Sequence, residues 1–127
     1  MAKTQPLIAV VDDDAEIGAA IVEFLLAADL TAQAFRSAEE FLASGHVART
    51  ACLFTDIVMP GMSGLELIQQ LNKAGHRIPT IVITGYPSKP SSAAVSRAGV
   101  SAFLSKPVEM KELLKFLHSL GLGNVQR

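Results

Sequence analysis

Five short apolar runs recur along the chain, each four or five residues long. Most of them are continuous rather than alternating, which is typical of strands that are covered on both faces. The runs are Leu7–Val11, Thr31–Phe35, Ala51–Thr55, Thr80–Ile83 and Ser101–Ser105. Because buried strands of this kind occur in parallel sheets flanked by helices, the pattern predicts an α/β protein.

Helical patterns fill the first three intervals between these runs, and their starts carry capping signals. Asp14 is a candidate N-cap ahead of apolar residues at helical spacing. Ser37 with Glu40, and Ser63 with Glu66, have the capping-box spacing, in which two side chains satisfy free backbone amides at a helix start. We therefore expect helices to begin at these three positions.

Two further helices are predicted in the second half of the chain. One runs from Ser91 to Ala98 and the other from Val108 or Glu109 to about Leu120, and a glycine follows each. Five strands then alternate with five helices, which predicts an open, doubly wound α/β sheet with right-handed crossovers. Ligands of such sheets bind outside the carboxyl ends of the strands, so we expect the functional residues to lie there.

The length and composition fit one domain with its own core. The chain has 127 residues, of which 50% are hydrophobic, and a domain of this size buries roughly two-thirds of the surface of its unfolded chain. No repeat, low-complexity tract or charge block in the sequence marks an internal boundary. We therefore expect a single domain over residues 1–127, with a core from about residue 7 to residue 120.

Charge and cysteine content argue against several classes of partner. Eleven Lys and Arg residues against 12 Asp and Glu residues give a net charge of −1, which offers no basic surface for nucleic acid. The longest strictly apolar run, Leu7–Val11, is far shorter than the ~18 residues of a membrane span. Cys52 is the single cysteine and no charged-then-apolar leader begins the sequence, so we expect a cytoplasmic protein that binds neither nucleic acid nor membranes directly.

Polar residues follow four of the five apolar runs. These residues are Asp12–Asp14, Asp56, Thr84 and Lys106. Taken alone, each has an ordinary explanation, such as helix capping for Asp14 or a surface position for the lysine. Carboxylates held close together repel one another unless they share a cation, and hard oxygen ligands with water suit Mg²⁺. Their joint placement at the strand ends therefore predicts a magnesium site.

Four short motifs at these positions resemble those of response regulator receiver domains, the phosphoryl-accepting part of two-component signalling. They are VVDDD, FTDIVMPGMSG, VITG and FLSKP. Each motif is weak alone, but they occur in order, with intervals of 43, 28 and 22 residues from Asp13 to Asp56, Thr84 and Lys106. The resemblance covers about Ile8 to Leu120 and implies a flavodoxin-like sheet of five parallel strands in the order 2-1-3-4-5.

The resemblance also implies roles for the residues at the strand ends. Asp56 is the expected phosphoacceptor. Asp13, Asp56 and the backbone carbonyl of Val58 are expected to ligate Mg²⁺, with Asp12 acting mainly through bound water. Lys106 is expected to pair with the phosphoryl oxygens. These roles agree with the chemistry of phosphoryl transfer, in which the protein positions groups and neutralises the charge on the transferred oxygens.

Four residues are implicated in switching and in the lifetime of the phosphorylated state. Thr84 is expected to hydrogen-bond the incoming phosphoryl group, and Phe103 has the position of the aromatic switch residue, although it would also pass as a core residue. Val58 and Tyr86, two residues past Asp56 and Thr84, lie where receiver domains control the approach of water. Neither side chain offers a carboxylate or amide to orient water, so we expect slow self-dephosphorylation.

The same resemblance implies the partners. The phosphoryl donor would be a histidine kinase or a histidine phosphotransfer protein, and the chain would act as a signalling domain rather than an enzyme. Its output partner or output domain would bind the face made by the fourth helix, the fifth strand and the fifth helix. No output module follows Leu120 in this sequence, so the chain is expected to be either a stand-alone receiver or part of a longer regulator or hybrid kinase.

Two other functions fit parts of this sequence. Asp12 and Asp14 form the DxD of a haloacid dehalogenase-type phosphohydrolase, but that enzyme needs a further acidic pair downstream, and only Asp29 and Asp56 follow as aspartates. A flavodoxin-like electron carrier needs a phosphate-binding loop after the first strand, whereas this loop is acidic and would repel the phosphate of FMN. Both alternatives are therefore disfavoured.

Overall fold

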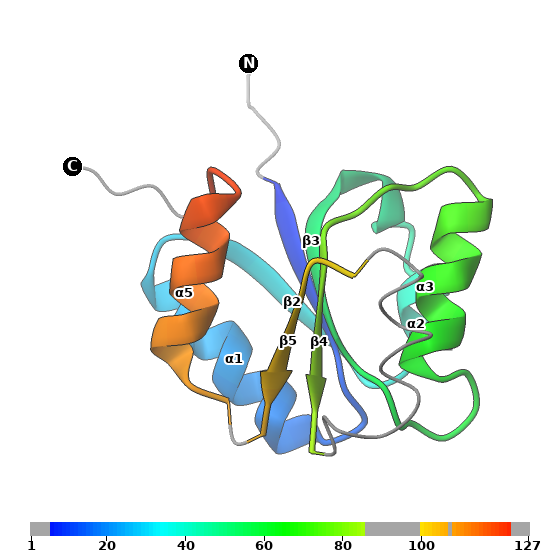
Figure 1. The fold of residues 1–127 in the computed structure, drawn as a ribbon, viewed down its shortest axis with the longest axis horizontal. Helices are drawn as coiled ribbons and strands as arrows, with labels where there is room; N and C mark the ends of the chain where they lie inside the picture. The colour runs from blue at the N-terminus through cyan, green and yellow to red at the C-terminus, as the bar shows by residue number, and fades with distance from the viewer. Residues whose placement is uncertain (1–5, 86–99, 107, 123–127) are drawn as a thin grey trace.

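Five parallel strands form one sheet in the order β2-β1-β3-β4-β5 (Figure 1). The computed structural model describes residues 6–85, 100–106 and 108–122. The strands are β1 (Leu7–Val11), β2 (Thr31–Phe35), β3 (Thr50–Asp56), β4 (Thr80–Thr84) and β5 (Ala102–Ser105). The flavodoxin-like sheet order implied by the resemblance is confirmed.

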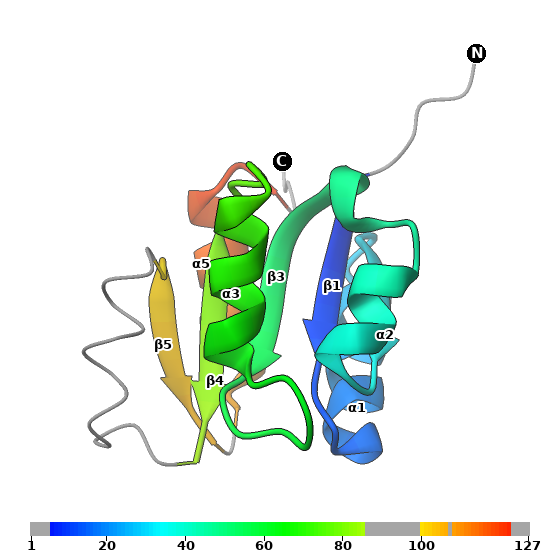
Figure 2. The same ribbon diagram turned by 90° about the vertical axis from the view of Figure 1, so that its right-hand side faces the viewer.

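Helices cover both faces of this sheet. On one face lie α1 (Ala15–Ala27) and α5 (Met110–Ser119), and on the other lie α2 (Ala38–Ala43) and α3 (Gly64–Lys73) (Figures 1 and 2). A single 3₁₀ turn, Val47–Arg49, precedes β3. The predicted fourth helix, from Ser91 to Ala98, lies outside the described residues. None of the helices in the described part of the chain is long and apolar enough to span a bilayer.

The continuous apolar runs are explained by burial on both faces of the sheet. In β1, Ile8 and Val10 pack with α1 and α5, whereas Ala9 and Val11 pack toward α2 and α3. All four side chains are at most 1% exposed, and burying a side chain of the size of Val or Ile contributes roughly 1.5–3 kcal/mol. Cys52 belongs to the core on the α1 and α5 side, where burial raises the pKa of its thiol to about 12. It is therefore a packing residue.

The helix starts follow the predicted caps, with one difference. The Asp14 carboxylate accepts hydrogen bonds from the first turn of α1, and Ser63 with Glu66 forms the complete capping box of α3. Ser37 caps α2 by accepting from the backbone N–H of Glu40. The Glu40 carboxylate, however, accepts from the backbone N–H of Arg36, one residue before the N-cap, at 2.8 Å. The predicted reciprocal bond to Ser37 is therefore replaced by a bond to its neighbour.

The strands β3 and β4 extend further than the apolar runs predict. Asp56 is still in register with Ile83, and Thr84 with Ser105, so both polar residues are the last members of their strands rather than the first residues of loops. The reason is that backbone pairing in a parallel sheet does not require an apolar side chain once the neighbouring strand continues. The polar residues at the carboxyl edge are thereby held by the sheet itself.

A backbone prediction concerns the turn after α1. Asp29 has a positive φ of 68°, a conformation that is costly for residues with a Cβ and free for glycine. We expect Asp29→Gly to raise the free energy of unfolding by about 0.5–1 kcal/mol, measured by urea denaturation. Ala28→Gly is the matched control. Ala28 has a φ of −94°, which alanine adopts without strain, so glycine at this position should lower the free energy of unfolding. An Asp29→Gly protein less stable than the unchanged chain would contradict this account.

Candidate functional site

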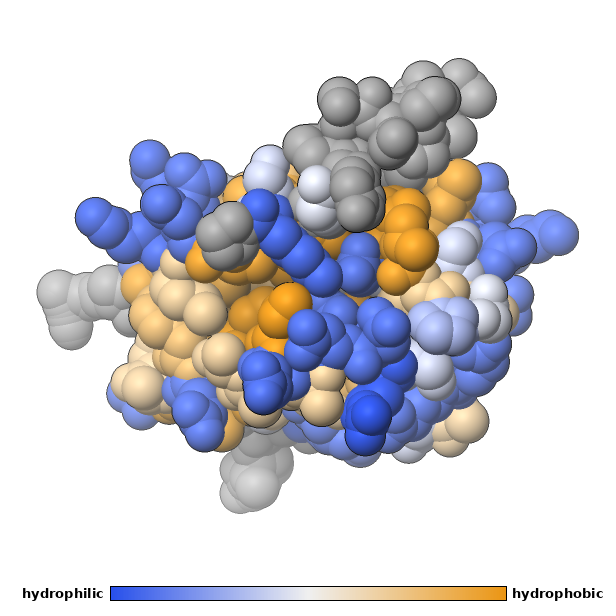
Figure 3. All heavy atoms as spheres, turned by 90° about the horizontal axis from the view of Figure 1, so that it is seen from below, coloured by the Kyte–Doolittle hydropathy of each residue, from blue (hydrophilic) through white to orange (hydrophobic). Residues whose placement is uncertain are grey.

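The candidate site lies at the carboxyl edge of the sheet, where three strands deliver polar side chains. Asp12 follows β1, Asp56 ends β3 and Lys106 follows β5. This edge faces the viewer in Figure 3, where hydrophilic residues extend across the middle of the face and hydrophobic residues flank them. The two aspartates are nearly inaccessible, with exposed fractions of 3% for Asp12 and 7% for Asp56.

Lys106 bridges the two buried carboxylates. Its Nζ lies 2.9 Å from Oδ2 of Asp56 and 3.3 Å from Oδ2 of Asp12. Asp12 and Asp56 are 44 positions apart in the sequence and Lys106 is farther along still, so the pairing of the strands brings the three residues together. A single ammonium therefore serves two carboxylates, and the net charge of this trio is negative.

Backbone amides hold the other oxygen of each carboxylate. Oδ1 of Asp56 accepts from the backbone N–H of Ile57 at 2.7 Å and from that of Val58 at 3.4 Å. Oδ1 of Asp12 accepts from the backbone N–H of Asp14 at 2.9 Å. Each carboxylate is thus oriented by the loop that follows its own strand, while its second oxygen faces the lysine.

Burial and charge shift the pKa values in this group. Burial raises the pKa of the Asp12 carboxyl above 3.8, against the opposing effects of the Asp14 amide and of the Lys106 charge, and the charge of Asp56 adds to the rise. Burial lowers the pKa of Lys106, but its hydrogen bond to Asp56 and the charges of both aspartates outweigh this effect, so its pKa lies above 10.5. Lys106 is therefore charged at neutral pH.

The raised pKa of Asp12 has a consequence for stability. Because the carboxyl binds its proton more tightly in the folded state than in the unfolded state, its ionised form lowers stability at neutral pH. That loss disappears as the pH falls through the raised pKa. A second cation beside Asp12 would offset the same loss at neutral pH.

The acidic cluster fits a divalent cation. Asp12, Asp13 and Asp56 each offer one carboxylate oxygen, and these three oxygens lie within 4.8 Å of one another. Asp13 is exposed, so the cluster opens to solvent on that side. Hard carboxylate oxygens that leave room for bound water are the ligands that Mg²⁺ prefers. Asp14 is separate from this group, because its side chain caps α1.

The remaining predicted residues are distributed around this edge. Val58 is 66% exposed and follows Asp56 by two positions. Phe103 lies opposite Val82 in the sheet and is half-buried against a small cluster formed by Val82 and Ile68. The side chain of Thr84 and the whole of Tyr86 lie outside the described residues. The structure therefore brings together the acidic residues and the lysine, while the gating and switch roles stay predictions.

Gly64 is a residue whose importance sequence reasoning missed. Its backbone N–H donates to the carbonyl of Ile57 at 2.9 Å, which closes the loop between β3 and α3. A Cβ on Gly64 would collide with the backbone carbonyl oxygen of Asp56. The available signal was a glycine at the first helical position, directly after the cap Ser63, where a better helix former is usual.

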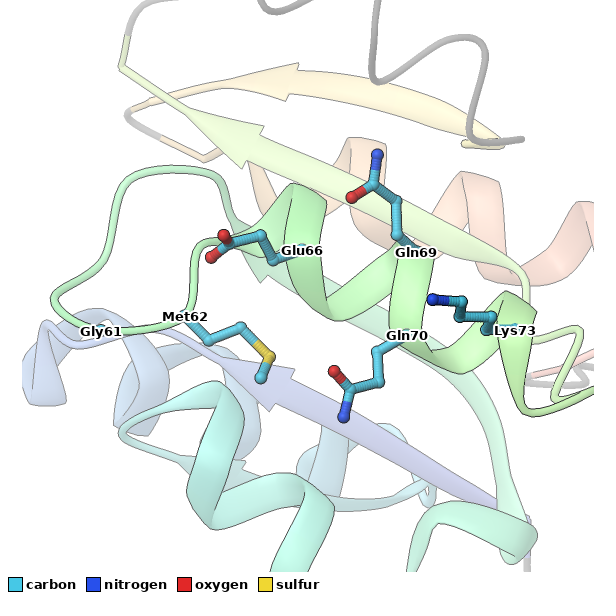
Figure 4. Close-up of a pocket in the computed structure, with 6 residues that line it drawn as sticks. All are labelled: Gly61, Met62, Glu66, Gln69, Gln70 and Lys73. Atoms are coloured by element: carbon cyan, nitrogen blue, oxygen red, sulfur yellow. The ribbon is translucent and has the colours of Figure 1, made fainter.

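A separate hollow of about 330 Å³ lies on the outer side of α3 (Figure 4). It is lined by Gly61, Met62, Glu66, Gln69, Gln70 and Lys73. The side chains of Met62 and Gln70 point toward each other across it. Its lining includes none of the clustered aspartates, and Glu66 is already engaged in the capping box of α3, so this hollow is not the candidate site.

Comparisons with known proteins were consistent with this geometry. The family model described as the response regulator receiver domain matches residues 8–118. Among curated proteins, nodulation protein W of Bradyrhizobium diazoefficiens is 35% identical over 113 residues, covering 89% of this chain and 50% of that protein. Response regulator protein TodT of Pseudomonas putida is 33% identical over 114 residues, covering 90% and 50%.

Solved structures give the same result. The structure described as FixJ-N is 30% identical and superposes with a TM-score of 0.82, covering 98% of this chain and 100% of that one. The chain spans about half the length of the curated relatives it matches. The similarity is therefore to one part of those proteins.

Replacement of Gly64 tests how closely the start of α3 approaches Asp56. We expect Gly64→Ala to lower the free energy of unfolding by about 2 kcal/mol or more, because the added methyl group must push the α3 start away from a strand backbone. Gly18→Ala is the control. Gly18 lies inside α1, where alanine is favoured, and a Cβ there would lie 3.4 Å from the Cβ of Ala34, an ordinary contact distance. Equal stability of both variants in thermal unfolding would show that the contact is not tight.

Proposed function

Because the chain belongs to the response regulator receiver domain family, we propose that it accepts a phosphoryl group on Asp56 from a histidine kinase or histidine phosphotransfer protein. It is a signalling domain of the two-component type. One observation carries the assignment of the acceptor. Among the clustered aspartates, Asp56 makes the shorter contact to Lys106, at 2.9 Å, and ends the central strand β3.

The proposed transfer breaks the bond between phosphorus and the donor imidazole, which keeps the electron pair, and forms a bond between phosphorus and an Asp56 oxygen. A carboxylate attacking a phosphoryl group must overcome repulsion between like charges. Lys106 neutralises part of that charge from its position between Asp12 and Asp56. A bound Mg²⁺, held by Asp12, Asp13, Asp56 and the backbone carbonyl of Val58, would supply the rest of the positive charge.

The switch is proposed to connect the acyl phosphate with the partner face. Thr84 would donate to the phosphoryl group, and Phe103 would change its packing against Val82 and Ile68. The output partner or output domain would bind the face of the fourth helix, β5 and α5. Two exposed lysines of α5, Lys111 and Lys115, support this proposal, because they offer charge on that helix.

The lifetime of the phosphorylated state is proposed to depend on Val58 and Tyr86. The exposed, apolar Val58 side chain has no group that could orient water, and this supports slow self-dephosphorylation. Residues 1–127 are proposed to form one receiver domain. A cytoplasmic location, expected from the cysteine content and the N-terminal sequence, stays a prediction.

Phosphorylation by a small donor tests the assignment of the acceptor. With Mg²⁺ and acetyl phosphate, we expect the chain to gain one phosphoryl group that hydroxylamine removes, as expected of an acyl phosphate. Asp56→Asn should abolish the gain, measured by intact mass. Asp14→Asn is the control, since Asn also caps helices and the Asp14 side chain is engaged at the start of α1. Equal uptake by Asp56→Asn and the unchanged chain would refute the assignment.

The metal site is tested by neighbouring aspartates with different tasks. Asp13→Asn should weaken Mg²⁺ binding about tenfold or more in a calorimetric titration, because Asp13 offers an oxygen to the cluster. The same variant should stabilise the metal-free fold slightly, because one of three mutually repelling charges is removed. Asp14→Asn should leave the affinity within about twofold. The same loss in both variants would mean that the ligand set has been misassigned.

A further inference from the structure

The loop between β3 and α3, residues 57–63, carries Val58 and is tied down at three points. At its start, the backbone N–H groups of Ile57 and Val58 donate to Asp56. Near its end, the capping box of Ser63 fixes the entry into α3, and the N–H of Gly64 donates back to Ile57. The third tie comes from a separate helix.

That third tie is made by Glu39 in the first turn of α2. Its Oε2 accepts a hydrogen bond from the backbone N–H of Met62 at 3.0 Å, across 23 positions of sequence. The same oxygen would lie only 2.7 Å from a Cβ on Gly61, so the loop backbone approaches the carboxylate closely. Gly61 also has a positive φ of 76°, which a glycine adopts without strain. The tip of the loop is therefore shaped to meet this side chain.

Packing places the same tip against α2. Met59 is buried in the core cluster that contains Phe35, Ala38 and Phe41, and Met62 packs against the same cluster. Val58, between them and Asp56, is instead 66% exposed. Side-chain packing therefore contributes little to the position of Val58, which depends mainly on the backbone ties on either side of it.

We propose that Glu39 is a positioning residue for the candidate metal site, acting through the loop and not by touching the metal. By holding Met62, the Glu39 carboxylate fixes the backbone of the loop, and with it the Val58 carbonyl and the amides that orient Asp56. This inference rests on the proposed function, because the position of the loop matters for function only if the Val58 carbonyl and Asp56 bind a metal ion. It also makes α2 a support of the site, although its residues are not in the acidic cluster.

Three variants separate this role from general effects on α2. Glu39→Ala removes the acceptor, whereas Glu39→Gln removes the same charge and keeps an oxygen that can accept from Met62. Glu40→Ala is the matched control. Glu40 lies on the same turn and carries the same charge, but its carboxylate accepts from Arg36, outside the loop. Any effect of charge or of α2 stability alone should therefore appear equally in Glu40→Ala.

Two measurements are made on each variant: the Kd for Mg²⁺ and the hydrogen-exchange rate of the Met62 amide without metal. Glu39→Ala should raise the Kd about two- to tenfold and speed exchange at Met62, as expected for loss of one hydrogen bond. Glu39→Gln should restore most of both values, and Glu40→Ala should resemble the unchanged chain. An unchanged Kd in Glu39→Ala, or an equal rise in Glu40→Ala, would overturn the proposal.

Failure of the proposed function is distinguishable from failure of this inference. If the function is wrong, the unchanged chain takes up neither Mg²⁺ nor a phosphoryl group. If only the positioning role is wrong, the unchanged chain does both, and Glu39→Ala behaves like Glu40→Ala. The exchange rate of Met62 reports the hydrogen bond itself and needs no ligand.

Discussion

The carboxyl edge of this sheet holds more negative charge than its own lysine can neutralise. Asp12 and Asp56 share the ammonium of Lys106, and the oxygen of Asp13 lies within the same 4.8 Å group. Buried ion pairs add little net stability, because removing the charges from water costs about as much as their attraction returns. The raised pKa of Asp12 is the sign of that cost. This cost supports the proposal that the cluster serves as a cation and phosphoryl site and is not retained for its stability.

The rest of the fold serves to hold these charges in place. Helices pack on both faces of the sheet and bury the strand side chains there, as with Val10 and Val11, which lie on opposite faces of β1. Only the strand ends remain available for polar chemistry. Because the register continues through Asp56 and Thr84, backbone pairing anchors Asp56, the proposed acceptor. The closed loop that returns through Gly64 is its second support.

Several features could be predicted from sequence: the strand runs, the caps of α1 and α3, and the close approach of Asp12, Asp56 and Lys106. Each follows from a local pattern or from the rule that parallel strands end at one edge. The Glu39 contact to Met62 could not, because an exposed glutamate in a first helical turn is common and its reach depends on how α2 sits against the loop. The close approach of Gly64 to Asp56 was equally hidden, since it depends on the path of the loop between them.

The two oxygens of Asp56 have different environments, and this asymmetry matters for a switch. Oδ1 is held by the backbone of its own loop, whereas Oδ2 is held by a lysine that comes from β5 and also contacts Asp12. A phosphoryl group on Asp56 would compete for both kinds of donor at once. A change in the lysine contacts would then act on β5. A change in the amide contacts would act on the loop that α2 and α3 support. A single change of charge would thus act, through separate elements, on the edge strand β5 and on the face of the sheet that α2 and α3 cover.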